Sequence, residues 1–282
     1  MIDKLYKRKV FNRAASSYDK HSMLQDKISD HLYDKLALIN IDPQSVLDLG
    51  CGTGRNGVRL SERFKAGNLV NYDLSDKMLR LTKDKFLELF PLPSRMADTS
   101  HYICGDIEQL PFQDNSFDLI WTSSAIQWCN NLPVSFDEII RVLSPNGLFI
   151  FSTFGPKTLW ELKEVNEKIS GESKTNKFIA KHNIDDLLLA SGFKSPLLEA
   201  KNITLPYSST EKLLLDIGKI GASNGNSNRS KGLRGRGFME SIKKEYESFK
   251  QDDLYPATYE VIYGHAWKGQ QPCEVKTGEL TK

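Results

Sequence analysis

The chain has 282 residues, 39% of them hydrophobic, which is enough to bury a core in one large domain. Its net charge of +2 indicates no class of partner, so any basic surface has to be found locally. The amino terminus lacks an apolar signal segment, and no run approaches the ~18 apolar residues of a membrane span. We expect a cytoplasmic protein that binds no membrane.

The first element that the sequence predicts is an amphipathic helix within residues 22–40. Its apolar side chains recur every three or four residues and predict a face packed on a core. The stripe consists of Leu24, Ile28, Leu32, Leu36 and Ile39.

From residue 45 the pattern changes to short apolar runs that alternate with helical segments. Strands separated by helices predict an α/β fold with a doubly wound, mostly parallel sheet. Ser75 fits the N-cap of a helix, and the "SPNG" of residues 144–147 reads as a turn that stops another. The predicted strands are "SVLDL", "NLVNYD", "HYICGD", "FDLIWTS" and "LFIFSTF".

The remainder of the chain predicts a helical and loop region that ends in a strand. The segment "GASNGNSNRSKGLRGRG" is a loop by composition. Helices are expected near 157–170, 183–191, 209–221 and 238–250, and a strand at 257–267.

The cysteines predict neither a disulfide framework nor a metal site. They form no CxxC pair and have no metal-type spacing, so we expect reduced thiols and no bound metal. They are Cys51, Cys104, Cys129 and Cys273.

The stretch "SVLDLGCGTGRNG" places a glycine loop between a strand that ends at Leu49 and a helix that starts near Arg55. Glycine lets the backbone approach a ligand and offer its N–H groups. The first three glycines, Gly50, Gly52 and Gly54, follow the strand in GxGxG spacing. The dinucleotide fingerprint would then need glycine where this chain has Arg55, so a pyrophosphate fits poorly.

Two acidic residues end the next predicted strands. Asp73 lies 19 residues after Gly54, where a carboxylate can bind both ribose hydroxyls. Asp106 ends the third strand, in position to meet an adenine amino group, with Ile107 beside it to pack on the ring. Each acid alone could be a helix cap or a solvated charge, but acids at successive strand ends together favour a nucleoside site.

These residues resemble the class I S-adenosylmethionine-dependent methyltransferases. The strings "VLDLGCGTG", "YDLSDKML", "GDIEQLPFQDNSFDLIWTSSAIQW" and "IIRVLSPNGLFIFST" match that family's motifs in order over residues 45–154. The resemblance implies S-adenosylmethionine as cofactor and a seven-stranded sheet with an antiparallel strand. It also implies cofactor contacts by Asp48, Gly50, Gly52, Gly54, Asp73, Leu74, Asp106 and Ile107.

The flanking segments resemble a narrower family, the malonyl-acyl-carrier-protein O-methyltransferases of biotin synthesis. The resemblance rests on "FNRAASSYDKHSMLQ", "IQWCNNLP", "TNKFIAKHNI", "LLLDIGKIGA" and "PATYEVIYGHAWK". It implies a methyl ester formed on the free carboxyl of a malonyl thioester. A carboxylate with a pKa of about 4 needs no general base, and the sequence shows no catalytic His or Cys constellation. The resemblance also implies an N-terminal lid over residues 1–40 and a methyltransferase domain over 41–282, with a substrate-side insert at about 157–250.

By the same resemblance, Tyr18 and Arg13 belong to the lid, with Tyr18 near the transferred methyl group and Arg13 pairing with a carboxylate. Tyr18 could equally be a hydrophobic staple, and Arg13 a surface charge. Trp128 follows the fourth strand at the ligand-binding edge of the sheet, although a core Trp is the alternative. Phe178 and Lys219 complete the candidate catalytic set. Lys177 stands where the family usually carries Arg.

The region 219–250 carries an excess of cations that predicts a docking surface for an acidic carrier protein. No aromatic residues interleave the arginines, so nucleic acid is not expected, and a solvated loop is the alternative. The cations are Lys219, Arg229, Lys231, Arg234, Arg236, Lys243, Lys244 and Lys250.

Two other functions compete with this hypothesis. One is the related complex I assembly methyltransferase that modifies a protein arginine, against which stands Gln127, where that relative has His. The other is a non-catalytic cofactor-binding assembly factor, against which stand the intact acids at the strand ends. The sequence leaves open whether the acceptor is malonyl-carrier protein or malonyl-coenzyme A, and it leaves the oligomeric state open.

Overall fold

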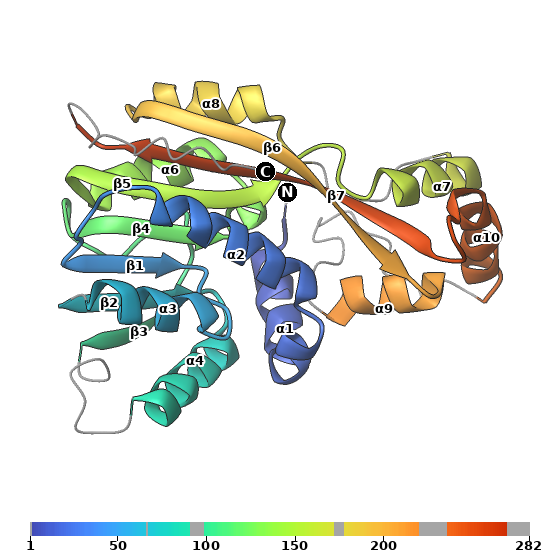
Figure 1. The fold of residues 1–282 in the computed structure, drawn as a ribbon, viewed down its shortest axis with the longest axis horizontal. Coiled ribbons are helices and arrows are strands. Elements are labelled where there is room, and N and C mark those ends of the chain that lie inside the picture. The colour runs from blue at the N-terminus through green and yellow to red at the C-terminus, as the bar shows by residue number, and fades with distance from the viewer. Residues whose placement is uncertain (1, 66, 91–98, 172–177, 220–235, 270–282) are drawn as a thin grey trace.

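A computed structural model describes residues 2–65, 67–90, 99–171, 178–219 and 236–269. Its centre is a seven-stranded sheet of order β3-β2-β1-β4-β5-β7-β6 (Figure 1). The first five strands in this order are parallel, and β7 runs antiparallel to both β5 and β6. This confirms the predicted fold. The strands are β1 (Ser45–Leu49), β2 (Asn68–Asp73), β3 (Ser100–Cys104), β4 (Phe117–Ser123), β5 (Leu143–Phe154), β6 (Lys194–Tyr207) and β7 (Tyr255–Trp267).

Helices cover both faces of the sheet. Successive strand residues point to opposite faces, and both sets are apolar. Val46 and Leu119 belong to the core under α2 and α3, whereas Leu47 and Ile120 belong to the core under α6 and α8. The helices are α1 (Lys4–Ala14), α2 (Met23–Ala37), α3 (Arg55–Phe64), α4 (Asp76–Leu89), α6 (Leu132–Val142), α7 (Trp160–Ser170), α8 (Lys181–Ala190), α9 (Thr210–Lys219) and α10 (Arg236–Tyr246), with short 3-10 turns η1 (Ala15–Lys20), η2 (Ile126–Trp128) and η3 (Glu247–Phe249).

The predicted apolar stripe of residues 22–40 is buried along α2. Leu24, Ile28, Leu32, Leu36 and Ile39 are all at most 4% exposed. The stripe therefore anchors the helix on the sheet and fixes where its first turn lies.

Polar ties hold α1 and η1 against the edge of the sheet where the parallel strands end. Asn12 donates to Asp76 Oδ1 at 2.9 Å, and Ser75 donates to Asn12 Oδ1 at 2.5 Å. In η1, Thr53 donates to Asp19 Oδ1 at 2.6 Å. The amino-terminal segment thus covers the glycine loop and the start of α4.

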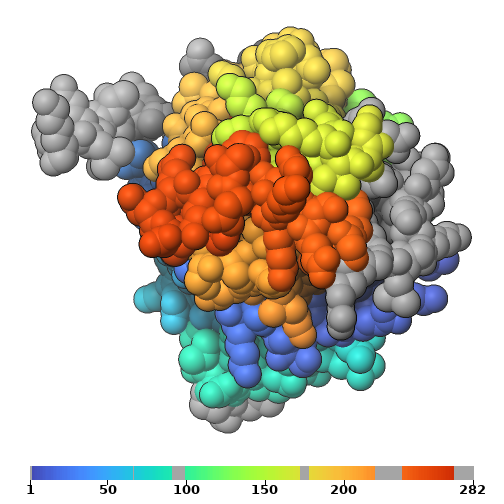
Figure 2. All heavy atoms as spheres, turned by 90° about the vertical axis from the view of Figure 1, so that its right-hand side faces the viewer, coloured from blue at the N-terminus to red at the C-terminus, as the bar shows by residue number. Residues whose placement is uncertain are grey.

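The carboxy-terminal half adds an arm of helices at the far end of the long β6–β7 pair (Figure 1). Trp160 of α7 packs edge-on against Phe249 with ring centroids 5.4 Å apart, and the Tyr246 hydroxyl of α10 donates to Pro256 O at 2.8 Å. Figure 2 shows α9 between α10 and α1 on this side of the molecule. His21 Nδ1 lies 2.8 Å from Asp216 Oδ1, so α9 also contacts the amino-terminal segment.

Two local features differ from the sequence prediction. The structure has a strand, β6, at residues 194–207, which the sequence did not predict because alternation there is weak and most side chains are exposed. Residues 144–147 do not form a separate turn: α6 ends at Val142, and these residues begin β5 and pair with Lys268. Asn146 takes a left-handed φ of 61° within this stretch. Ser75 caps α4 as predicted, accepting from Met78 N.

Within the described residues, no helix combines the length and apolar character that crossing a membrane would require.

Candidate functional site

A cavity of about 880 Å³, measured to its open mouth, lies where β1, β2 and β4 end and the amino-terminal segment covers them. Parallel strands present their carboxyl ends at one edge, which is where ligands bind in sheets of this kind. Predicted residues that line the cavity are Tyr18, Gly50, Gly52, Asp73, Leu74, Asp106, Ile107 and Trp128.

The glycine loop forms the floor of this cavity. Gly50 and Gly54 have φ angles of 81° and 84°, in the left-handed region that disfavours other residues. A Cβ on Gly50 would lie 2.3 Å from Ala125 Cβ, whereas a Cβ on Gly52 would meet nothing within 4 Å. Glycine therefore relieves a clash at the first position and keeps space open at Gly52. Gly54 is the N-cap of α3 and does not line the cavity.

Asp73 connects the floor of the cavity to α4. Its carboxylate accepts from Gly52 N at 2.9 Å and from Ser75 N at 2.7 Å. Burial raises its pKa to about 6, although these two N–H groups oppose the shift. The side chain can thus shape the loop while its carboxylate still borders the cavity.

Asp48 lies behind the glycine loop and does not line the cavity. It is 1% exposed, and burial, followed by the nearby charge of Asp73, raises its pKa to about 8. The Gly57 backbone amide opposes this shift. Two acidic groups therefore lie close together on one side of the loop, where a cationic ligand would relieve their repulsion.

Asp106 and Ile107 line the other end of the cavity, and Lys4 of α1 binds there. Lys4 Nζ is 2.7 Å from Asp106 Oδ1 and 2.6 Å from Glu108 Oε2. These partners raise the lysine pKa, although burial acts as the largest single effect in the opposite direction. Lys4 was not among the predicted site residues, since a lysine in a charged amino terminus gives no signal by itself.

The candidate substrate residues fall into two groups. Tyr18 and Trp128 line the cavity, and Phe178 packs against the lining residue Phe154 with ring centroids 5.6 Å apart. Burial raises the pKa of Tyr18, so its hydroxyl stays protonated. Arg13 and Lys219 are exposed and do not line the cavity, and Lys177 lies outside the described residues.

Lys7 and Gln25 also line the cavity and were missed by the sequence analysis. Lys7 is fully buried, with its Nζ 3.5 Å from the centroid of the Trp128 ring, and Phe11 packs edge-on against the same ring. Gln25 directly follows Leu24 of the apolar stripe. A polar residue beside a buried apolar stripe is a weak sequence signal for a side chain that lines a cavity.

The cavity fits the cofactor that the resemblance implies. Gly52 leaves open space beside Asp73, whose carboxylate can accept from ribose hydroxyls. Asp106 and Ile107 offer an acceptor and an apolar surface for a purine at the other end. Buried acidic groups suit a ligand with positive charge.

Comparisons with known proteins agree with this geometry. The family model "Methyltransferase domain" matches residues 47–151. The chain is 41% identical to a malonyl-acyl-carrier-protein O-methyltransferase from Methylovorus sp. (strain MP688), over 99% of this chain and 93% of the relative. A protein of the same name from Gallionella capsiferriformans (strain ES-2) is 37% identical, over 95% of this chain and 92% of the relative.

Solved structures show the same fold at low sequence identity. The YcgJ protein from Bacillus subtilis is 16% identical, with a TM-score of 0.59 over 86% of this chain and 99% of its own. The phosphoethanolamine N-methyltransferase 2 of Haemonchus contortus, solved with S-adenosylhomocysteine, has a TM-score of 0.54 at 18% identity, over 86% of this chain and 53% of its own.

Replacing Asp73 is expected to weaken cofactor binding. Asp73→Ala removes the predicted ribose acceptor and the partner of Gly52 N, so affinity for S-adenosylhomocysteine should fall by about 1–3 kcal/mol, the scale of hydrogen bonds to a charged group. Isothermal titration calorimetry measures this loss, and circular dichroism checks that the fold is kept. Unchanged affinity in a folded variant would contradict the ribose assignment.

Replacing Asp48 should change how stability depends on pH. In the folded protein its pKa is raised from 3.8 to about 8, so its contribution is full below pH 3.8 and is lost as the pH rises to about 8. Asp48→Asn should therefore raise the Tm of the ligand-free protein more at pH 9 than at pH 5, by at least about 2–4 °C. The exposed Asp137→Asn serves as the control. An equal effect of Asp48→Asn at both pH values would show that the buried charge costs no stability.

Proposed function

The chain belongs to the malonyl-acyl-carrier-protein O-methyltransferases, within the class I S-adenosylmethionine-dependent methyltransferases, and on this premise we propose that it methylates the free carboxylate of malonyl-acyl-carrier protein. The product is the malonyl methyl ester that enters biotin synthesis. The observation that carries the proposal is the identity of 41% over 99% of the chain.

The chemistry of the cavity supports a carboxylate acceptor. Among the described lining residues there is no histidine, and burial raises the pKa of the Cys129 thiol to about 11 and that of Tyr18 above its usual value. Both groups are therefore protonated at neutral pH and are poor bases. A malonyl carboxylate is already ionised and needs none.

When bound, the cofactor would supply an electrophilic methyl group on its sulfonium: the bond from the acceptor carboxylate oxygen to the methyl carbon forms as the bond from that carbon to sulfur breaks, and S-adenosylhomocysteine leaves. In this proposal Asp73 binds the ribose, while Asp106 and Ile107 bind the adenine. Tyr18 and Trp128 border the space left for the acceptor and exclude water from it, which raises the reactivity of a carboxylate. Phe178 supports this wall through Phe154.

We also propose a domain organisation for the chain. Residues 1–40 act as a lid, and residues 41–282 form the methyltransferase domain with a substrate-side insert at about 157–250. The contacts of Lys4 with Asp106 and of Asp19 with Thr53 support the first part, because the lid binds the same loops that line or flank the cavity.

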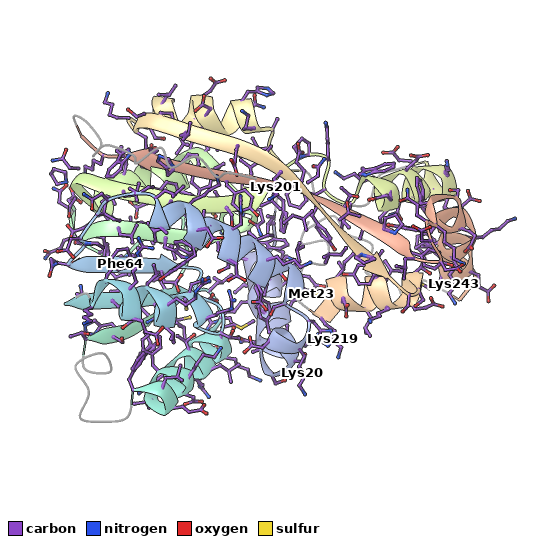
Figure 3. The ribbon with its side chains drawn as sticks, viewed as in Figure 1. Lys20, Met23, Phe64, Lys201, Lys219 and Lys243 are labelled. Atoms are coloured by element: carbon purple, nitrogen blue, oxygen red, sulfur yellow. The ribbon has the colours of Figure 1, made fainter. Side chains whose placement is uncertain are left out.

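The acidic carrier protein is proposed to approach from α9. Lys219 is exposed at the carboxyl end of this helix, and Figure 3 shows it on the side toward Lys20 and Met23. Lys243 lies farther along the arm and pairs with Glu211. Lys219 has no ion-pair partner among the described residues, and such a cation near the amino-terminal segment suits steering of an acidic partner better than one held in an ion pair.

The other cations of the predicted docking region are either held in ion pairs or lie outside the part of the chain that the structure describes, apart from the exposed Lys244. Lys250 pairs with Glu247 and Asp253. Arg229, Lys231 and Arg234 lie outside the described residues, as does the side chain of Arg236.

The relatives do not favour the alternative of a protein-arginine methyltransferase or a non-catalytic assembly factor, since several carry the malonyl-carrier-protein name. Malonyl-coenzyme A remains the competing acceptor. The cytoplasmic location and the absence of nucleic-acid and membrane partners stay predictions that belong to this proposal.

A direct assay tests the reaction and its pH dependence. With saturating labelled cofactor, malonyl-carrier protein should be methylated and an arginine peptide should not. The single-turnover rate should be flat between pH 6 and 8, because an ionised carboxylate loses no proton. A rate that climbs about tenfold per pH unit would mean that a proton is removed and that the acceptor is not a carboxylate.

Reversing the charge at Lys219 tests the docking side. Lys219→Glu should raise the apparent KM for malonyl-carrier protein several-fold and leave malonyl-coenzyme A nearly unaffected, because exposed charges steer encounter. The double variant Arg234→Glu with Arg236→Glu should act in the same direction. Lys243→Glu, at a cation already paired with Glu211, is the matched control with a smaller expected effect. Equal large losses on both substrates would place Lys219 in the reaction site instead.

A further inference from the structure

Gln25 of α2 borders the cavity, and the proposed function above gives it no role. It lies in the first turn of the helix and lines the cavity. Its Oε1 is buried and has no hydrogen-bond donor among the described residues. A buried amide oxygen without a donor costs about 1–3 kcal/mol, so its position at a ligand cavity indicates a donor on the ligand.

Contacts of neighbouring residues place this turn beside the glycine loop. Asp26, the next residue, has Oδ1 3.5 Å from Nε of Arg55, which starts α3 directly after Gly54. Asp19 of η1 accepts from Thr53 in the loop itself at 2.6 Å. Gln25 therefore lies toward the loop end of the cavity, away from the Lys4–Asp106 contact at the other end.

Two other polar side chains of the cavity already have partners, whereas the buried Ser124 Oγ, like Gln25 Oε1, has none among the described residues. Gln127 donates through Nε2 to Ser124 O at 2.6 Å, and its Oε1 accepts from Thr153 at 3.4 Å. Asp73 accepts from two backbone N–H groups. Gln25 is thus the lining glutamine whose oxygen is left for a ligand.

We propose that Gln25 Oε1 accepts a hydrogen bond from the α-ammonium of the cofactor's methionine part. The proposal rests on S-adenosylmethionine as the cofactor of the proposed function, and not on the identity of the acceptor. With the ribose at Asp73 and the adenine at Asp106, the methionine part would lie on the side of Gly50 and Gly52, the loop end of the cavity that Gln25 also lines. The malonyl thioester group itself offers no N–H donor, whereas an ammonium offers three.

Ligand-binding calorimetry on the full chain tests this assignment without any turnover. The ligands are S-adenosylhomocysteine, its analogue without the α-amino group, and 5′-methylthioadenosine, which lacks the amino-acid part. In Gln25→Met the Kd for S-adenosylhomocysteine should rise about ten- to a hundredfold, the range for a hydrogen bond to a charged group. The Kd values of the other two ligands should stay within about twofold of the wild-type values.

Gln25→Glu is a second variant, which tests whether the ligand group at this position is positively charged. A carboxylate at this position should bind S-adenosylhomocysteine at least as tightly as wild type, because it accepts from the ammonium and adds charge attraction. Gln127→Met is the matched control: it is a glutamine in the same cavity whose amide is already bonded, so it should not discriminate between S-adenosylhomocysteine and its deamino analogue.

Three results would overturn the assignment. Unchanged binding of S-adenosylhomocysteine in Gln25→Met would mean that the Gln25 side chain does not bind the cofactor and is free to bind the acceptor or the amide of its pantetheine arm. Equal weakening of all three ligands would mean that Gln25 only supports the cavity wall. Weaker binding in Gln25→Glu would mean that the amide donates to a carboxylate. If instead none of the wild-type titrations shows binding, the cofactor assignment itself fails.

Discussion

The carboxylate of Asp73 is the contact on which the cavity depends. It accepts from Gly52 N of the glycine loop and from Ser75 N at the start of α4. The loop needs these hydrogen bonds because Gly50, Gly52 and Gly54 all take left-handed conformations, and fixing glycine in one conformation costs backbone entropy. Burial raises the pKa of the carboxyl that accepts these bonds to about 6, so the group that shapes the site is itself held in an unfavourable environment.

The covering of the cavity is built mainly from polar contacts, in contrast to the apolar core below it. Arg8 and Asn12 bind Asp76, Asp19 binds Thr53 and Lys85, and Lys4 binds Asp106 and Glu108. Partly exposed ion pairs contribute little each and weaken with salt. The proposed lid would therefore release the cavity at far lower cost than the sheet can open, as entry and exit of a ligand require.

The sequence predicted the parts of this site that local pattern determines. Strand ends and glycine spacing located Gly50, Asp73 and Asp106, because parallel strands bring their carboxyl ends together whatever the loops do. The pattern did not locate Lys4 or Gln25, whose positions depend on how α1 and α2 pack across the sheet. Residues 194–207 escaped prediction because β6 lies at the edge of the sheet and is paired only with β7, so its side chains carry little alternation.

The contact between His21 and Asp216 joins two parts of the molecule that the chain separates by 195 residues. One belongs to the segment that covers the cavity, and the other to the helix from which the carrier protein is proposed to approach. Thermodynamic linkage is reciprocal: if a carrier binds α9 more tightly when the cofactor is bound beneath this segment, the bound carrier must tighten cofactor binding by the same factor. This contact would then make cofactor retention and carrier binding one cooperative event.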